Sequence, residues 1–261
     1  MTVMVIVGIC GAIGSGKSTF AELLTAIAPS QSIHLETSTL VIELANTFNS
    51  TLWSRKAALQ GSNDPISLVN KCIRALIPQL NAMSGDEVSV NQVLIDEDDV
   101  AARPEWYEKL FTYLVQAQQM PTTAGQKITA ENKTHYRPLL QWIGGYFLYK
   151  LGNKLLWYEE LLRRVQAAGP DIILAVLTAP RQPSEAEFVK AAGGKVIKIV
   201  RPGLISDTTD VTERQVANII PDTIITNNGS VTDLRDTAKK VQAALLQDTL
   251  RASYSARDMT G

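Results

Sequence analysis

The chain has 261 residues, 45% of them hydrophobic, which is enough for one large α/β domain with an insertion or for two small domains. Its net charge of −1 creates no overall field that would attract nucleic acid or an anionic membrane. Two cysteines form no disulfide framework, and two histidines are too few for a zinc site or a serine–histidine nucleophile. The N-terminal apolar stretch is too short to span a bilayer and has no basic lead. We therefore expect a reduced, cytoplasmic protein with no signal peptide or membrane anchor.

An apolar run over residues 3–10 leads directly into GAIGSGKS, which matches the phosphate-loop pattern G-x-x-x-x-G-K-[ST] and precedes a helical pattern. In such a loop, backbone N–H groups point at an anion and the next helix adds its positive end. Lys17 is expected to reach the β- and γ-phosphates, and the Ser18 hydroxyl to bind Mg²⁺. The predicted nucleotide-binding residues are Gly11, Ala12, Gly14, Ser15, Gly16, Lys17, Ser18 and Thr19. The sequence therefore predicts a nucleoside triphosphate site.

Five short apolar segments, each bounded by turn-forming residues or a helical pattern, are typical of strands. They cover residues 3–10, 32–36, 172–178, 195–200 and 222–226. Runs such as IILAVL and KVIKIV lack polar alternation, which favours a parallel sheet with helices on both faces. The segment SEAEFVKAA is expected to form the helix between the third and fourth strands.

Between the second and third strands, residues 40–170 have a mainly helical pattern. Apolar residues recur at three- and four-residue spacing over 38–48, 53–60, 64–82, 102–119 and 136–168. We interpret 40–170 as a helical, substrate-binding insertion within a single domain, 1–248, rather than as an independent domain. The polar, unpatterned residues 249–261 are expected to form a flexible tail.

The segment HYRPLLQWIGGYF contains candidates for binding a second ligand. Arg137 and Gln141 are four residues apart, hence on one helical face, and Gly144 and Gly145 leave room beside them. An arginine offers a planar fork for a phosphate, and a glutamine can pair with the edge of a base. The same pattern also fits an amphipathic helix with a solvated arginine.

Three arginines follow the third and fourth strands, at the edge where open α/β sheets bind ligands. Arg181 could neutralise charge on a phosphoryl group, or it could pair with Glu185 four residues later. Arg201 and Arg214 belong to a polar segment that could close over a triphosphate, or they could lie on a solvated loop and helix.

Two more candidates lie at the ends of predicted strands. Glu36 could orient an acceptor or the waters of a metal ion, or it could be a solvated loop acid. Asn227 and Gly229 lie in a turn where a nucleoside base could rest, although a plain strand-to-helix turn fits equally well. Ser230 and Asp233 are predicted to cap the following helix.

The layout resembles the nucleoside monophosphate kinase group of P-loop proteins, particularly the phage-type deoxynucleoside monophosphate kinases. The stretches that carry this resemblance are GICGAIGSGKST, RPLLQWIGGYF, PRQPSEAEFVKAAGGKVIKIVRPG and IITNNGSVTDL. The first is also similar to the phosphate loop of dephospho-CoA kinases. Together they cover about residues 1–40 and 136–245.

The resemblance implies a three-layer αβα P-loop kinase fold, ATP and Mg²⁺ as cofactors and a nucleotide as the small-molecule substrate. It places Arg137, Gln141 and Gly144 at motif positions, and Arg181, Glu185, Gly194, Arg201, Asn227 and Gly229 match the family in type. Together with the residue patterns above, the predicted catalytic residues are Lys17, Arg181, Arg201 and Arg214, and Asn227 and Gly229 are predicted to contact the nucleotide. The predicted substrate-binding residues are Glu36, Arg137, Gln141 and Gly144, and Ser18 is predicted to bind the metal.

The chain departs from the family pattern at two places. An Asp-x-Arg arrangement is expected after the third strand, where this chain has Ala179, Pro180 and Arg181. A His-x-Ser-Glu pattern is expected near the lid, where Asp210, Thr212 and Glu213 stand.

Three hypotheses follow. The first is transfer of the γ-phosphoryl group of ATP to a (deoxy)nucleoside monophosphate. The second is a dephospho-CoA kinase or another small-molecule kinase, and the third is a nucleotide-binding protein that no longer catalyses. We expect no nucleic-acid or membrane partner, and the sequence leaves the oligomeric state open, a homodimer included.

Overall fold

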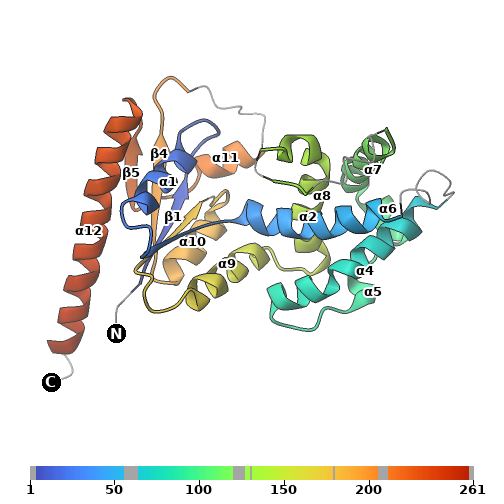
Figure 1. Ribbon diagram of the computed structural model, residues 1–261, viewed down its shortest axis with the longest axis horizontal. Coiled ribbons are helices and arrows are strands. Elements are labelled where there is room, and N and C mark those ends of the chain that lie inside the picture. The colour runs from blue at the N-terminus through green and yellow to red at the C-terminus, as the bar shows by residue number, and fades with distance from the viewer. Residues whose placement is uncertain are drawn as a thin grey trace. The chain divides into compact units, whose positions relative to one another are not determined.

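The computed structural model describes residues 4–55, 64–119, 127–129, 131–178, 180–204 and 211–258 (Figure 1). The chain divides into two compact units, one formed by Met1–Thr37 with Leu161–Gly261 and the other by Ser38–Glu160. The second unit closely matches the predicted helical insertion. That the two act as a single kinase domain stays a prediction. None of the helices in the described part of the chain is long and apolar enough to cross a membrane.

The first unit is built on a five-stranded sheet in which all neighbouring strands are parallel. The strands are β1 (Val5–Cys10), β2 (Ser32–Glu36), β3 (Leu174–Thr178), β4 (Lys195–Val200) and β5 (Thr223–Thr226), in the order β2-β3-β1-β4-β5. The predicted α/β class, the five strands and the large helical insertion between the second and third are therefore confirmed. The order makes β1 the central strand, with the carboxyl end of β3 beside that of β1 and the carboxyl end of β2 beside that of β3.

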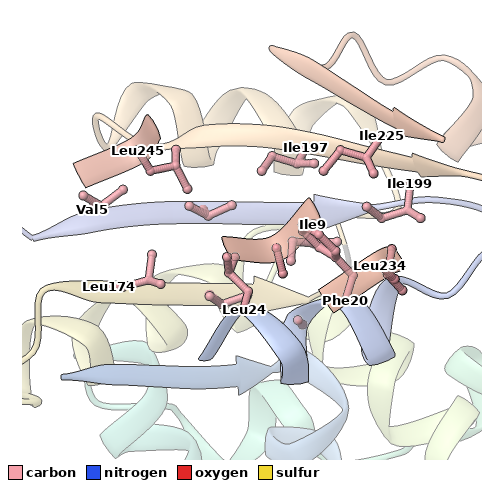
Figure 2. Packing of buried hydrophobic residues seen from close by; sticks show 14 residues of the cluster. Val5, Ile9, Phe20, Leu24, Leu174, Ile197, Ile199, Ile225, Leu234 and Leu245 are labelled. Carbon is pink, nitrogen blue, oxygen red and sulfur yellow. The ribbon is translucent and has the colours of Figure 1, made fainter. Parts of the chain in front are cut away.

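Alternate residues of β1 point to opposite faces of the sheet, and each face is covered by helices. On one face, β1 packs with α1 (Lys17–Ala26) and α12 (Val231–Asp258) around a buried apolar cluster (Figure 2). Strand and helix residues labelled there are Val5, Ile9, Phe20, Leu24, Leu174, Ile197, Ile199, Ile225, Leu234 and Leu245. Burial of each large side chain contributes about 2 kcal/mol before the loss of conformational entropy is subtracted.

The opposite face of β1 packs against α10 (Pro183–Ala191) through Gly8. A Cβ atom at Gly8 would lie 3.3 Å from a methyl group of Val189 and 3.2 Å from Cγ of Pro180, so the helix approaches the strand closely. Helix, sheet and helix thus form three layers within this unit, as the sequence predicts.

The C-terminal helix is longer than the sequence suggests. α12 continues through Asp258, although residues 249–261 were expected to be a flexible tail, so that expectation is wrong for the part up to Asp258. The segment contains neither Gly nor Pro between Val231 and Asp258, and polar residues with good helix propensity extend a helix once it has formed. Residues 259–261 lie outside the described residues.

Helices make up the second unit, as predicted. They are α2 (Thr37–Trp53), α4 (Pro65–Ser84), α5 (Val90–Val93), α6 (Glu97–Ala102), α7 (Pro104–Gln119), the 3₁₀ helix Lys133–Tyr136 and α8 (Arg137–Lys150). The next helix, α9 (Leu156–Ala167), begins in this unit, and its residues from Leu161 onward belong to the first unit. The helical pattern over 136–168 is divided at Gly152, whose φ of +66° does not continue a helix. Of the predicted segment 53–60, Trp53 ends α2 and residues 56–60 lie outside the described residues.

The core of the second unit contains a cluster of aromatic rings centred on α8. Trp142 stacks on Tyr146 with 4.7 Å between ring centroids and meets the edge of Phe48 from α2 at 5.4 Å. The buried Tyr146 hydroxyl donates to the carbonyl oxygen of Val93 at 3.0 Å. These contacts orient α8, so that Arg137 and Gln141 are left on its exposed side.

Candidate phosphate-binding site

The loop between β1 and α1 has the geometry that its glycines predict. Gly14 and Gly16 have φ values of +80° and +93°, in the left-handed region that favours glycine. A Cβ atom at Gly11 would lie 2.5 Å from the carbonyl oxygen of Ile199 in β4. Because Gly16 is the N-cap of α1, the unpaired N–H groups of that helix's first turn belong to the loop. This is the backbone arrangement that binds phosphate.

Asn227, directly after β5, supports the loop. Its Nδ2 donates to the carbonyl oxygen of Ser15 at 2.8 Å, and a Cβ atom at Gly16 would collide with the same amide. The backbone N–H of Asn227 donates to the carbonyl oxygen of Val200 at 2.7 Å, which fixes the residue on β4. The structure thus shows a loop-supporting contact for Asn227, and the predicted contact with a base stays a prediction.

Lys17 lies half-buried at the start of α1, where its Nζ donates to the carbonyl oxygen of Ala12 at 3.2 Å. Burial lowers the pKa of Lys17, and the positive charge of Arg181 lowers that pKa further. The carboxylates of Glu213 and Glu36 act on it in the opposite direction. The positive charge of Arg181 thus acts at Lys17, beside the N–H groups at the start of α1, and positive charge there favours an anion.

Arg181 follows β3 and precedes α10, as predicted. The carboxylate of Glu185 accepts hydrogen bonds from the backbone N–H groups of Arg181 at 2.6 Å and Gln182 at 3.0 Å, forming a capping box. The predicted alternative was a side-chain ion pair between Arg181 and Glu185, whereas the contact described between them involves the Arg181 backbone. The Arg181 side chain itself is exposed.

Glu36 belongs to a three-residue cluster at the carboxyl ends of β2 and β3. The Thr178 hydroxyl donates to Oε1 of Glu36 at 3.0 Å, and Nε2 of His34 lies 2.6 Å from the same hydroxyl. In the sheet register, Thr178 is paired with Glu36 on β2 and with Ile9 on β1. Glu36 is therefore no solvated loop acid, because a hydroxyl from the neighbouring strand holds it.

Glu213 connects α11 (Val211–Ala217) to the phosphate loop. The backbone N–H of Ile13 points at both of its carboxylate oxygens, at 3.2 and 3.3 Å, and Glu213 is only 8% exposed. A pocket of about 220 Å³ lies beside this contact and is lined by the loop, the end of β4 and α11. The Ser15 hydroxyl in its wall is fully buried and has no hydrogen-bond partner among the residues that the structure describes.

The other two candidate arginines, Arg201 and Arg214, are exposed. Arg201 lies just after β4 and lines the pocket, and Arg214 lies on α11. Gly229 has a local role, because a Cβ atom there would lie 2.5 Å from Oδ2 of Asp233. Asp233 and Ser230 form the predicted helix cap through a pair of hydrogen bonds of 2.8 Å. Ala179 and Asp210 lie outside the described residues.

Arg137, Gln141 and Gly144 lie in the second unit, on α8. Both side chains are exposed on the same face, as their spacing predicts. A Cβ atom at Gly144 would make an ordinary 3.7 Å contact with Val41. Gly145, in contrast, was expected to leave room for a ligand, and that expectation is wrong because the ring of Trp106 fills the space.

The sequence did not reveal the roles of His34 and Thr178, or the contact of Glu213 with the loop. A threonine ending an apolar strand and a histidine within another give no functional signal by themselves. Their contacts depend on strand pairing between segments more than a hundred residues apart, as the 144-residue separation of His34 and Thr178 illustrates.

A sequence model of the family "Deoxynucleotide monophosphate kinase" matches residues 5–238 of this chain. A deoxynucleotide monophosphate kinase of Escherichia phage RB69 is 31% identical over 106 residues, which are 40% of this chain and 43% of that protein. A protein of Acanthamoeba polyphaga mimivirus, provisionally given the same name, is 35% identical over 77 residues, 29% of this chain and 37% of its own length. The chain thus spans less than half the length of these curated relatives. Since the family match extends over most of its length, the chain belongs to the deoxynucleotide monophosphate kinase family.

Proposed function

We propose that this protein transfers the γ-phosphoryl group of ATP to a deoxynucleoside monophosphate and releases ADP and the nucleoside diphosphate. In this reaction an oxygen of the acceptor phosphate bonds to the γ-phosphorus while the bond to the β–γ bridging oxygen breaks. The observation that carries the proposal is the phosphate loop itself, whose N–H groups lie at the N-terminus of α1 with Lys17 held against the carbonyl oxygen of Ala12. Family membership supports the choice of acceptor.

Positioning and charge neutralisation account for most of the catalysis of phosphoryl transfer, so the residues need not form covalent bonds to the substrate. The loop N–H groups and Lys17 would hold the β- and γ-phosphates, and Arg181 would neutralise charge on the transferred group. Arg201 and Arg214 would contribute further positive charge. Asn227 and Gly229 are proposed to lie near the nucleoside of ATP.

The acceptor is proposed to bind to the exposed face of α8. Arg137 would bind its phosphate, since a guanidinium fork matches phosphate oxygens. Gln141 would contact the base, and Gly144 would allow the ligand to approach the helix. The proposal is supported by the shared exposure of the two side chains.

Oxygen ligands near the loop fit Mg²⁺, which prefers hard oxygen donors. The exposed hydroxyl of Ser18 would bind the ion, and the carboxylate of Glu36 would orient its waters. Among the described residues no group of three or more His, Cys, Asp or Glu could hold a metal ion, which suits an ion carried largely by nucleotide phosphates. When bound, Mg²⁺ neutralises charge on the β- and γ-phosphate oxygens.

The test is a screen of the purified protein with ATP and Mg²⁺ against deoxynucleoside monophosphates, ribonucleoside monophosphates and dephospho-CoA. ADP formation that requires a deoxynucleoside monophosphate, with the diphosphate identified by chromatography, would support the proposal. Activity on dephospho-CoA alone would replace it with the second hypothesis. ATP binding without transfer to any acceptor would favour a nucleotide-binding protein.

A further inference from the structure

Strand β3 ends in a residue with a hydroxyl group, beside the part of β1 that leads into the phosphate loop. No acidic residue occurs from Ile172 to Pro180, and Thr178 is the last residue of the strand. Its register partners are Ile9 on the central strand β1, just before the loop, and Glu36 on the edge strand β2. The end of β3 therefore supplies no carboxylate of its own, and Glu36 on the neighbouring strand is the carboxylate whose contact with Thr178 is described.

The hydrogen atoms in this cluster can be assigned from its chemistry. A carboxylate only accepts hydrogen bonds, so the single proton of the Thr178 hydroxyl points at Oε1 of Glu36, 3.0 Å away. The hydroxyl oxygen is then left to accept from its other neighbour, Nε2 of His34, at 2.6 Å, and this Nε2 also lies 3.6 Å from Oε1 of Glu36. His34 therefore carries a hydrogen on Nε2, and the donation runs from His34 to Thr178 to Glu36.

Burial makes this chain of hydrogen bonds costly to break. Thr178 is only 3% exposed, and a buried hydroxyl without a partner costs about 1–3 kcal/mol. The side chains of His34 and Glu36 are 21% and 30% exposed, so the chain begins and ends near the surface while its centre is covered. Glu36 is thereby anchored through Oε1, and its charge still acts on Lys17.

We infer that Thr178 and His34 are positioning residues that hold the carboxylate of Glu36 toward the phosphate site, in place of an acid on β3. The geometry of this inference comes from the hydrogen bonds among His34, Thr178 and Glu36. Its expected effect on catalysis rests on the proposed function. Residues that orient a carboxylate near a metal typically alter activity or metal affinity by 10–100-fold when they are replaced.

The first experiment needs no activity. The chain contains only two histidines, His34 and His135, so the His135→Gln variant assigns their imidazole signals. In long-range ¹H–¹⁵N spectra of the ligand-free protein, we expect His34 to carry its hydrogen on Nε2. A hydrogen on Nδ1 alone would overturn the inference, whether or not the protein is a kinase.

The second experiment compares Thr178→Val, which removes the hydroxyl while keeping the shape, with Thr178→Ser, which retains it. We expect Thr178→Val to lower kcat about tenfold with less than about threefold change in KM for the deoxynucleoside monophosphate, and Thr178→Ser to recover most of the lost kcat. Thr237→Val is the matched control, since its hydroxyl bonds only within α12. An unchanged kcat in Thr178→Val, with Glu36→Gln strongly impaired, would overturn the inference.

A double-mutant cycle separates positioning from general structural damage. If Thr178 acts through Glu36, adding Thr178→Val to Glu36→Gln should lower kcat by less than about twofold further, because coupled residues are not additive. Full additivity would contradict the inference. His34→Leu should behave like Thr178→Val, and His34→Gln, which keeps a donor near Nε2, should lose less.

ATP affinity, measured with Mg²⁺ and with EDTA, distinguishes this inference from the proposed function. Thr178→Val should weaken binding about tenfold with Mg²⁺ and leave it unchanged with EDTA. If the wild-type protein binds ATP and transfers phosphate to no acceptor, the proposed function fails while this result still decides the role of Thr178. Equal losses under both conditions would assign Thr178 to folding of the site and overturn the inference.

Discussion

The side-chain amide of Asn227 donates a hydrogen bond to the carbonyl oxygen of Ser15, with 2.8 Å between Nδ2 and O. Ser15 lies within the phosphate loop, whereas Asn227 follows the last strand, 212 positions later in the chain. The bond therefore ties the Ser15 carbonyl group to the end of β5, so that part of the loop's conformation depends on a distant segment of the chain. The N–H groups of a loop fixed in this way are preorganised and can bind an anion without first having to be ordered.

Replacing Asn227 should accordingly weaken nucleotide binding. We expect Asn227→Leu to reduce ATP affinity about tenfold, since the loss of this partly buried hydrogen bond costs about 1 kcal/mol and the loop becomes less ordered. Calorimetric titration with ATP measures the change. Asn228→Ala, at the exposed neighbouring position, should bind as the wild type does. Equal affinity in both variants would show that the contact is not needed for binding.

Lys17→Ala removes the cation at the head of α1. Since loss of one preorganised donor typically costs about 3 kcal/mol, kcat should fall on the order of a hundredfold or more. Steady-state assays with the acceptor found in the screen provide the measurement. Lys239→Ala on the exposed side of α12, where the lysine pairs only with Asp236, should leave kcat unchanged. Undiminished transfer by Lys17→Ala would exclude this loop from catalysis.

Glu213→Gln tests the contact between α11 and the loop. The glutamine keeps an acceptor for the Ile13 N–H but removes a negative charge from beside the anion site. We expect ATP affinity to rise about three- to tenfold at low salt, and the gain to shrink at high salt. Titrations at two ionic strengths measure this, with the exposed Glu187→Gln as control. Weaker binding would mean that the carboxylate helps to hold the nucleotide.

Two adjacent glycines of α8 should respond oppositely to alanine. Gly145→Ala should lower the free energy of unfolding by about 1 kcal/mol or more, because the new methyl group collides with the Trp106 ring. Gly144→Ala meets only Val41 at 3.7 Å and should raise it by up to about 1 kcal/mol through helix propensity. Urea unfolding and tryptophan fluorescence separate the two, and equal stabilities would contradict the packing described for Trp106.

The buried Cys72 thiol should make stability depend on alkaline pH. Burial raises the pKa of Cys72 from 9.0 to about 12, so the unfolded chain releases this proton more easily than the folded one. The contribution of the Cys72 thiol to the free energy of unfolding is therefore fully present below about pH 9 and is lost as the pH rises toward 12. Between about pH 8 and about pH 10.5, the free energy of unfolding of the wild type should fall by roughly 2 kcal/mol more than that of Cys72→Ala. Equal losses, measured by urea unfolding, would contradict the predicted burial effect.

Much of the fold could be predicted because its signals are local. Strand segments, the phosphate loop and the cap formed by Ser230 and Asp233 each depend on residues that are neighbours in sequence. The end of α12 was misjudged for a related reason: a polar stretch without periodicity looks unstructured, but helix formation continues unless a breaker interrupts it.

The sequence by itself determined that the first strand and the next helix would form an anion-binding loop, since glycine positions and the lysine are set within eight residues, GAIGSGKS. Only the tertiary structure decided which groups surround that loop. Thr178 reaches Glu36, Glu213 reaches Ile13 and Asn227 reaches Ser15 across large separations in the chain. Such contacts arise from strand order and register, which follow from the packing of the whole sheet rather than from local residue patterns.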